Sequence, residues 1–427
     1  MNAGGQRARG GINWLLWLTA AFTGGLGAWN LMSAARGFEG DLAMLQTIYL
    51  AFGLLVALGI ALIDYHIFER IAYPLFFLSL LSLLAVLAVG RVASGSRRWI
   101  PLGLFNFQPS EMAKIAVILA LAKYFSDESD PPAAGYRLWD LIKPATPFYP
   151  LGALGALILF WEKAPLAEAG HWRFLMLAAC MIWAALSVLY VYRVGRTSLH
   201  DMLSPVIPIV LPAILIIRQP DLGTSLALAA VAGTIILFMK VRFRSLLIAA
   251  AVLVAASVAS WYLVLEPYQK GRIEAFLSPG TDTMGSGYHA YQSIIAVGSG
   301  RLHGKGFMES TQTKYQFLPE QHTDFVFSVW AEERGFIGCA LVLGLFLFLL
   351  VQIVNIASGA RDRFGVLIGV GMAGMVFWHL FINVGMVIGV LPVVGITLPL
   401  WSYGGSSVVA ILVGVGLLMS VSRHKRA

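Results

Sequence analysis

Long apolar stretches alternate with short polar segments along nearly the whole chain, and this pattern predicts membrane-spanning helices. A spanning helix needs about 20 mostly apolar residues. The sequence therefore predicts an all-α polytopic membrane protein with about twelve transmembrane helices. These are expected at residues 13–35, 42–64, 71–90, 110–126, 146–161, 172–194, 203–217, 223–240, 245–265, 326–356, 364–391 and 405–422.

The distribution of Lys and Arg predicts the orientation of these helices. If the N-terminus lies in the cytoplasm, every cytoplasmic loop contains at least one cation, as the positive-inside rule requires. An even number of spans also places the C-terminus in the cytoplasm. Two loops on the opposite side, 91–109 and 266–325, contain more cations than the rule favours, so we expect functional residues there.

The second of these loops, residues 266–325, has the composition of a folded segment. It is rich in glycine but also contains many aromatic and aliphatic residues, which a disordered linker would lack. We therefore expect a large extracytoplasmic loop with short helices near 267–277 and 288–297.

Composition excludes several other classes of protein. Hydrophobic residues make up 58% of the chain and charged residues only 12%, which is typical of neither a soluble enzyme nor a disordered protein. The net charge of +8 does not indicate a nucleic-acid partner, because Lys and Arg lie mostly in short clusters between apolar stretches. Both cysteines lie within apolar stretches, so no disulfide framework is expected.

A first group of charged residues lies where the loop 91–109 meets the next span. Pro109 and Ser110 predict a helix start with Ser110 as the N-cap. Glu111 and Lys114 then lie three residues apart on one helix face. They form either an ion pair tolerated at the interface or part of a polar cavity that binds a charged substrate.

A second group lies in the turn RQPDLGTS, at 218–225. Pro220 predicts a break between two spans. Asp221 either pairs with Arg218 at the interface or faces the same cavity as Glu111.

The third and densest group comprises residues 303–324, directly before a long apolar span. An acid at the start of a helix can simply complement the helix dipole, and Asp324 is placed to do so. That explanation needs only one acid, whereas this segment also contains Lys305, Gln312, Lys314, Glu320 and His322. Dipole stabilisation would keep Asp324 ionised at neutral pH, so it is a candidate proton acceptor or metal ligand.

Two further motifs have both a structural and a functional interpretation. The sequence SYGGSS at 402–407 begins the last span, where free backbone N–H groups cap a helix or bind an anion such as pyrophosphate. His379 and Asn383 lie one turn apart within a span and are expected to join helices to one another. The sequence contains no phosphate-binding Walker loop, zinc motif or nucleophile elbow.

These segments together resemble the SEDS family (shape, elongation, division and sporulation) of bacterial membrane proteins. Residues 107–111 and the Thr-Gln pair at 311–312 are more similar to the elongation branch than to the division branch. His289 and Arg334 depart from the usual family residues. The matching stretches are RRWIPLGLFNFQPSEMAK from Arg97, RQPDLGTSL from Arg218, YQKGRIEAFLSP from Tyr268, YQSIIAVGSGRLHGKGF from Tyr291, TQTKYQFLPEQHTDFVFSVWAEERGFIG from Thr311, and INVGMVIGVLPVVGITLPLWSYGGSS from Ile382.

The resemblance implies a peptidoglycan glycosyltransferase in the bacterial plasma (inner) membrane. Such enzymes polymerise lipid II, a disaccharide-pentapeptide on undecaprenyl pyrophosphate, during elongation and cell-shape maintenance. Their partner is a class B penicillin-binding protein, which crosslinks the peptides. Family members usually have ten spans, so the chain is expected to be one domain, 1–427, with a helical pair inserted at 144–200.

By their positions in the family motifs, Asp324 is implied to be the essential acid and Glu111, Lys114 and Asp221 to be cavity residues. The reaction is expected to be one inverting displacement with Asp324 as general base. No organic cofactor is expected, whereas a divalent cation, Mg²⁺ or Mn²⁺, is one candidate for stabilising the leaving pyrophosphate. Further candidates for substrate contact are Arg98, Arg272, Lys305, Gln312, Glu320 and Ser402.

Two rival functions remain open at this stage. A lipid II flippase would also have many spans and charges within the membrane. A non-catalytic scaffold for the crosslinking partner would leave the polar cluster at 303–324 unexplained.

Overall fold

The computed structural model describes most of the chain outside one long central segment. The inserted pair predicted at 144–200, with its spans 146–161 and 172–194, lies outside the described residues. The described ranges are 11–36, 40–93, 96–101, 106–127, 135–137, 205–263, 267–277, 286–315, 317–318 and 320–424.

The described chain is mostly helical, as predicted. Within it, five helices are long and apolar enough to cross a membrane, namely α2, α3, α15, α16 and α17. The short helices predicted in the loop 266–325 are present as α12 and α13. The helices are α1 Trp14–Ala34, α2 Leu42–Leu62, α3 Tyr65–Val89, α4 Pro109–Ser126, α9 Ile207–Arg218, α10 Leu222–Phe238, α11 Phe243–Leu263, α12 Pro267–Leu277, α13 Ser286–Ser299, α14 Thr311–Lys314, α15 Val326–Ser358, α16 Arg363–Val387 and α17 Gly405–Arg423.

A small sheet interrupts the helical pattern, so the all-α prediction is wrong for the loop 91–109. Strands β1 (Arg91–Ala93), β2 (Ser96–Pro101) and β3 (Asn106–Phe107) pair antiparallel in the order β1-β2-β3. Strands this short contain too few residues for an alternating pattern to be recognised in the sequence. The sheet leads directly into α4 and positions Arg98 at the end of the bundle.

Carboxylate side chains begin several of the helices. Asp41, Asp64, Asp221 and Asp362 are the N-caps of α2, α3, α10 and α16, and each accepts a backbone N–H from the first turn. The predicted cap at Ser110 is wrong, because α4 begins at Pro109 with Gln108 as its N-cap. Proline suits the first helical position, since it lacks the N–H that would otherwise need a partner.

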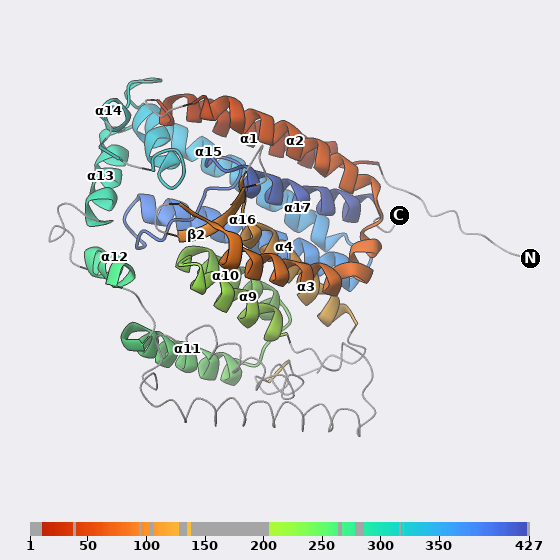
Figure 1. The fold of residues 1–427 in the computed structure, drawn as a ribbon. Helices are drawn as coiled ribbons and strands as arrows, with labels where there is room; N and C mark the ends of the chain where they lie inside the picture. The colour runs from red at the N-terminus through yellow and green to blue at the C-terminus, as the bar shows by residue number, and fades with distance from the viewer. Residues whose placement is uncertain are drawn as a thin grey trace, which may run out of the picture.

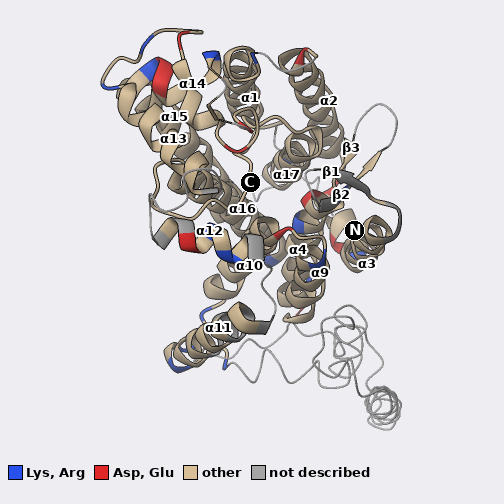
Figure 2. Cartoon of the chain, turned by 60° about the vertical axis from the view of Figure 1, so that its left-hand side comes forward, with Lys and Arg blue, Asp and Glu red and all other residues tan. Residues whose placement is uncertain are grey.

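Helix α16 occupies the centre of the bundle and packs against α4, α10, α15 and α17. Helix α17 packs mainly against α2, while α1 lies against α2 and α15. Helices α12, α13 and α14 lie together at one end of the bundle, away from the chain termini (Figure 1). Charged residues lie mainly near the helix ends (Figure 2). The end with α12–α14 is called the cap end below.

Helix α15 contains a break at Gly335, whose φ of 64° and ψ of −163° are not helical. The amides of Phe336 and Ile337, freed by this break, donate to the carbonyls of Arg301 and Leu302. A Cβ at position 335 would lie 2.4 Å from the Gly304 nitrogen, so only glycine permits this close approach. The break therefore docks the segment after α13 against α15.

Candidate active site

Asp324 lies at the cap end, in the turn directly before α15. Phe325 is the N-cap of that helix, so the carboxylate of Asp324 does not cap it. The side chain is only partly buried. Gly395, with a positive φ of 73°, lies so close that a Cβ there would be 3.1 Å from Oδ2 of Asp324. The chain before α17 therefore forms one wall of the site around this carboxylate.

The surroundings of Asp324 raise its pKa rather than lower it. Burial, the largest effect, and the neighbouring Glu320 carboxylate raise the pKa of Asp324 to about 6. Arg272 and Arg98 act in the opposite direction, which places both guanidinium groups near the carboxylate. The predicted stabilisation by the helix dipole is thus not the dominant effect. The carboxylate is still mostly ionised at pH 7, as a proton acceptor must be.

Arg98 of β2, whose charge lowers the pKa of Asp324, forms an ion pair with Asp221 at the start of α10. Its Nη1 lies 3.7 Å from Oδ2 of Asp221, and its Nη2 donates to the carbonyl of Pro220. Asp221 is buried and accepts hydrogen bonds from the backbone N–H and the hydroxyl of Thr224. Asp221 therefore forms an ion pair with Arg98 from the sheet, a partner that the sequence did not indicate.

Glu111 and Lys114 form the predicted ion pair, and α16 supplies a third member. Nζ of Lys114 lies 2.8 Å from Oε1 of Glu111 and 2.7 Å from Nε2 of His379. The exposed fractions are only 1% for Lys114, 4% for Glu111 and 2% for His379. Within the described structure, Oε2 of Glu111 is buried without a hydrogen-bond partner. The group is a buried polar cluster, so it is not a surface ion pair.

Backbone groups on both sides of Asp324 are held by buried side chains. Nδ2 of Asn383 on α16 donates to the carbonyls of Asp324, at 3.0 Å, and Ile396, at 2.7 Å. The hydroxyl of Ser402 donates to the carbonyl of Thr323 and accepts the N–H of Leu398. Ser402 therefore supports the Asp324 turn through the backbone. The sequence identified Asn383 only as a helix–helix contact.

The other predicted substrate residues at the cap end differ in their surroundings. Lys305 forms an ion pair with the buried Glu332 of α15, at 2.6 Å. Gln312 is buried and donates to Gln292 of α13, while Glu320 is exposed beside Asp324. Lys305 thus fixes the loop onto α15. Of these residues, Glu320 is the one that acts directly on Asp324, because its charge raises the pKa of that carboxyl.

The serines of the motif 402–407 also bind neighbouring loops. Ser406 accepts the N–H of Gln108 and donates to the carbonyl of Asn106, while the hydroxyls of Ser407 and Thr397 lie 3.1 Å apart. These contacts support the structural interpretation of the motif and join α17 to the sheet.

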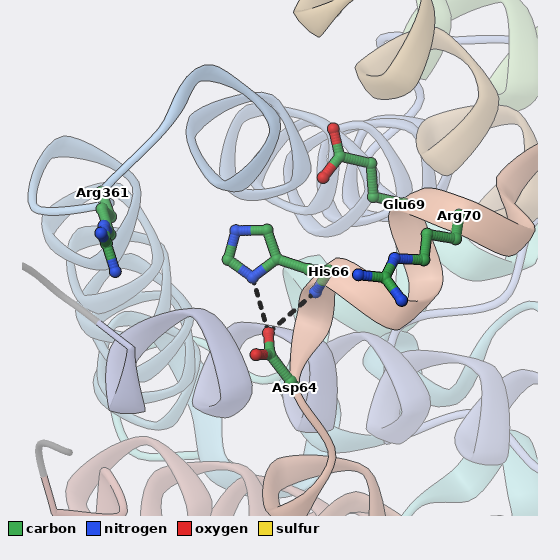
Figure 3. Close-up of a pocket in the computed structure, with 5 residues that line it drawn as sticks. All are labelled: Asp64, His66, Glu69, Arg70 and Arg361. Carbon is green, nitrogen blue, oxygen red and sulfur yellow. Dashed lines mark hydrogen bonds and ion pairs between the residues drawn. The ribbon is translucent and has the colours of Figure 1, made fainter. Parts of the chain in front are cut away.

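A charged cavity of about 360 Å³ lies at the opposite end of the bundle. It is lined by Asp64, His66, Glu69, Arg70 and Arg361 (Figure 3). The imidazole of His66 lies between two N-cap carboxylates, 2.6 Å from Asp64 and 2.9 Å from Asp362. This contact joins the turn before α3 to the turn before α16.

No group of three or more His, Cys, Asp or Glu side chains that could hold a metal ion occurs among the described residues. The basic side chains near Asp324 are Arg98 and Arg272.

Fold and site together define a class: a helical membrane protein with a charged site at one end of its bundle. The family described as "Cell cycle protein", named for FtsW, RodA and SpoVE, matches residues 14–159 and 172–427. The chain belongs to this family. The resemblance stated from the motifs is thereby confirmed.

Individual relatives cover most of the chain. Peptidoglycan glycosyltransferase MrdB of Escherichia coli (strain K12) is 34% identical over 378 residues, covering 88% of this chain and 84% of that protein. Peptidoglycan glycosyltransferase RodA of Treponema pallidum is 31% identical over 435 residues, covering 97% and 98%.

Two solved structures are similar over nearly their whole length. One belongs to a peptidoglycan synthase complex and concerns its coordination of polymerization and crosslinking, with a TM-score of 0.69, 32% identity and coverage of 97% and 98%. The other is the rod-shape-determining protein RodA of Thermus thermophilus, with a TM-score of 0.60, 30% identity and coverage of 97% and 98%.

Proposed function

We infer that this protein is a peptidoglycan glycosyltransferase that polymerises lipid II into glycan strands during cell-wall elongation. The observation that carries this inference is the carboxylate of Asp324, with a pKa of about 6 and two arginines nearby, in a chain of this family. A partly buried carboxylate that is ionised at neutral pH suits a general base. The relatives that bear this activity by name cover most of the chain.

The stereochemistry of the reaction calls for one base and no covalent intermediate. The donor sugar carries its pyrophosphate in the α configuration and the product bond is β, so a single displacement inverts C1. Asp324 removes the proton from the 4-hydroxyl of the acceptor as that oxygen attacks C1. The C1–oxygen bond of the donor breaks, and its electrons leave with the pyrophosphate.

The leaving pyrophosphate needs positive charge, and we assign this role to Arg98 and Arg272 beside Asp324, with Lys114 deeper in the same region. Fixed cations in a site that excludes water stabilise developing charge strongly. A divalent cation bound by the substrate itself is compatible with this arrangement.

An apolar cavity of about 490 Å³ supports a lipid-linked substrate. It lies between α3, α4 and α17, and Phe107 of β3 contributes to its wall. Met112 and Ile115, which also line it, are neighbours of Glu111 and Lys114 on α4. An isoprenoid tail in this cavity would place the pyrophosphate near the charged groups, which is a gain in proximity.

Orientation and partners follow from the same proposal. Twelve spans with both termini in the cytoplasm place the cap end outside the plasma (inner) membrane, where lipid II is polymerised. The positive-inside pattern supports this orientation. A class B penicillin-binding protein is the proposed partner, in line with the similar chain from a peptidoglycan synthase complex.

The decisive experiment uses the full-length protein and its partner in vesicles with labelled lipid II. Asp324→Asn should abolish polymer formation while expression, folding and partner binding stay normal. Glu309→Gln, an exposed acid on the same loop, is the matched control and should remain active. Normal glycan synthesis by the Asn variant would contradict the proposal, while lipid translocation without polymer would favour a flippase.

A further inference from the structure

Helix α16 carries two buried polar residues, His379 and Asn383, that face the candidate site. They are four residues apart, so they lie on one face of the helix, about one turn from each other. Their exposed fractions are 2% and 0%. Each forms a hydrogen bond with a different part of the site.

His379 fixes the ammonium group of Lys114. Its Nδ1 lies 2.8 Å from the carbonyl of Met375 on the preceding turn, and this contact requires the proton to be on Nδ1. Nε2 is then an acceptor, and Nζ of Lys114 donates to it at 2.7 Å. With Glu111 as its second acceptor, the ammonium is held by two groups that lie on different helices.

Asn383 fixes the backbone of Asp324. Its amide group donates to the carbonyls of Asp324 and Ile396, which belong to the two chain segments that form the walls around the carboxylate. The backbone N–H of Asp324 donates to the carbonyl of Glu320, so the peptide groups on both sides of the residue are restrained.

We propose that α16 is a positioning element, in which His379 and Asn383 set the spacing between the Lys114 ammonium and the Asp324 carboxylate. The proposal rests on the function inferred above, in which Lys114 binds the donor's pyrophosphate and Asp324 deprotonates the acceptor. One rigid helix then determines where the donor and the acceptor meet. A misplacement of about 1 Å can cost a reaction roughly 100-fold in rate.

The two residues should affect different kinetic constants. Asn383→Ala should lower kcat about 10- to 100-fold with little change in KM, because the base is misplaced but the donor still binds. It should also move the acidic midpoint of the pH–rate profile, since the carboxylate shifts relative to Glu320 and Arg272. Asn383→Ser keeps one donor and should be intermediate.

His379→Leu should instead raise the KM for lipid II, because the Lys114 ammonium loses one of the acceptors that orient it. His379→Gln restores an acceptor and should recover much of the affinity. Met386→Leu, a volume-conserving change at a buried apolar position of α16, is the control and should leave both constants unchanged.

Steady-state polymerisation of labelled lipid II by the purified complex separates the possible outcomes. If Asp324→Asn is inactive but Asn383→Ala and His379→Leu retain normal kcat and KM per folded molecule, only this inference fails. If Asp324→Asn remains active, the proposed function itself fails. If Asn383→Ala or His379→Leu does not fold, the milder variants Asn383→Ser and His379→Gln are measured instead. Normal kcat and KM for both of these would contradict the positioning role.

Discussion

The carboxylate of Asp324 lies between one like charge, Glu320, and two opposite charges, Arg98 and Arg272. Its pKa is therefore the result of competing effects, and single substitutions should move it in known directions. A pKa of about 6 leaves the carboxylate mostly ionised at neutral pH and still basic enough to accept a proton.

We expect the polymerisation rate to rise with pH with a midpoint near pH 6, because only ionised Asp324 accepts a proton. Glu320→Gln removes the like charge and should move the midpoint to lower pH. Arg272→Gln should move it to higher pH. Initial rates with labelled lipid II from pH 5 to 8 test both directions, and shifts of the opposite sign would exclude Asp324 as the titrating group.

Ionisation of Asp324 should lower the thermal stability of the protein, although it raises the rate of polymerisation. The pKa of Asp324 is about 6 in the folded protein and 3.8 ordinarily, so the folded state binds more protons between these values. Stability from this group is therefore highest below pH 3.8 and is lost as pH rises through 6. Asp324→Asn should raise the Tm at pH 7.5, and a lower Tm would show that the carboxylate is stabilising.

The sequence predicted contacts between residues that are close together along the chain. Glu111 and Lys114 pair as predicted, because helical spacing alone brings them together. The pairing of Arg98 with Asp221 was missed, since it depends on how β2 and α10 meet in space. His379 was underestimated for the same reason: its partner Lys114 lies on another helix.

Among the elements, the loop between α13 and α15 is fixed by one buried acid. Glu332 of α15 accepts hydrogen bonds from Lys305, Ser310 and Thr311. Its side chain is fully buried. This contact holds the loop, and with it the turn that contains Asp324, against the helix.

Replacement of this acid should destabilise the cap end. Glu332→Gln removes the charge that strengthens these hydrogen bonds, and hydrogen bonds to charged groups contribute about 1.5–3 kcal/mol each. We expect a loss of about 2–3 kcal/mol, measured as a lower Tm in detergent. Glu309→Gln, which breaks the exposed pair with Lys314, should not change the Tm measurably. Equal Tm values for the two variants would contradict this account.

Hydropathy predicted where the described helices lie, because an apolar stretch is a local property of the sequence. Helix α15 begins at Val326, and α17 begins at Gly405, both as predicted. The sheet β1–β3 was not predicted, because its strands are short and follow an apolar span directly. The N-cap of α4 was assigned to Ser110 because hydroxyl side chains are common caps, whereas Pro109 determined the actual start.

Arg334, which departs from the family pattern, packs against aromatic rings from neighbouring elements. The guanidinium of Arg334 lies over the rings of Trp29, at 4.5 Å, Phe307 and Trp330. Cation–π contacts of this kind join α1, the loop before α14 and α15. Arg334 thus stabilises the packing beside the break at Gly335 and is not placed at the candidate site.

For the whole molecule, the sequence predicted the class and the family but not the arrangement of the helices. Nothing in the apolar pattern shows that α16 lies at the centre, in contact with α4, α10, α15 and α17. Helix packing depends on complementary side-chain shapes between distant segments. The placement of the site at one end of the bundle therefore required the structure.

Deletion of residues 144–200, with a short linker in their place, tests the predicted insertion. The segment contains none of the stretches quoted above for the family resemblance, and spans that line a polar cavity usually carry inward polar groups. The shortened protein should therefore fold and still polymerise lipid II with its partner. A protein that folds but makes no glycan would show that the segment belongs to the catalytic machinery.

The break at Gly335 divides α15 into a short first part and a long apolar second part. Residues 336–358 of α15 are long enough, at about 35 Å, to cross the hydrocarbon layer of about 30 Å by themselves. If this second part crosses the bilayer, we expect the residues before the break, and Asp324 with them, to lie at or beyond its outer surface. The newly formed glycan would consequently emerge directly into water, while the lipid tails of both substrates never leave the bilayer.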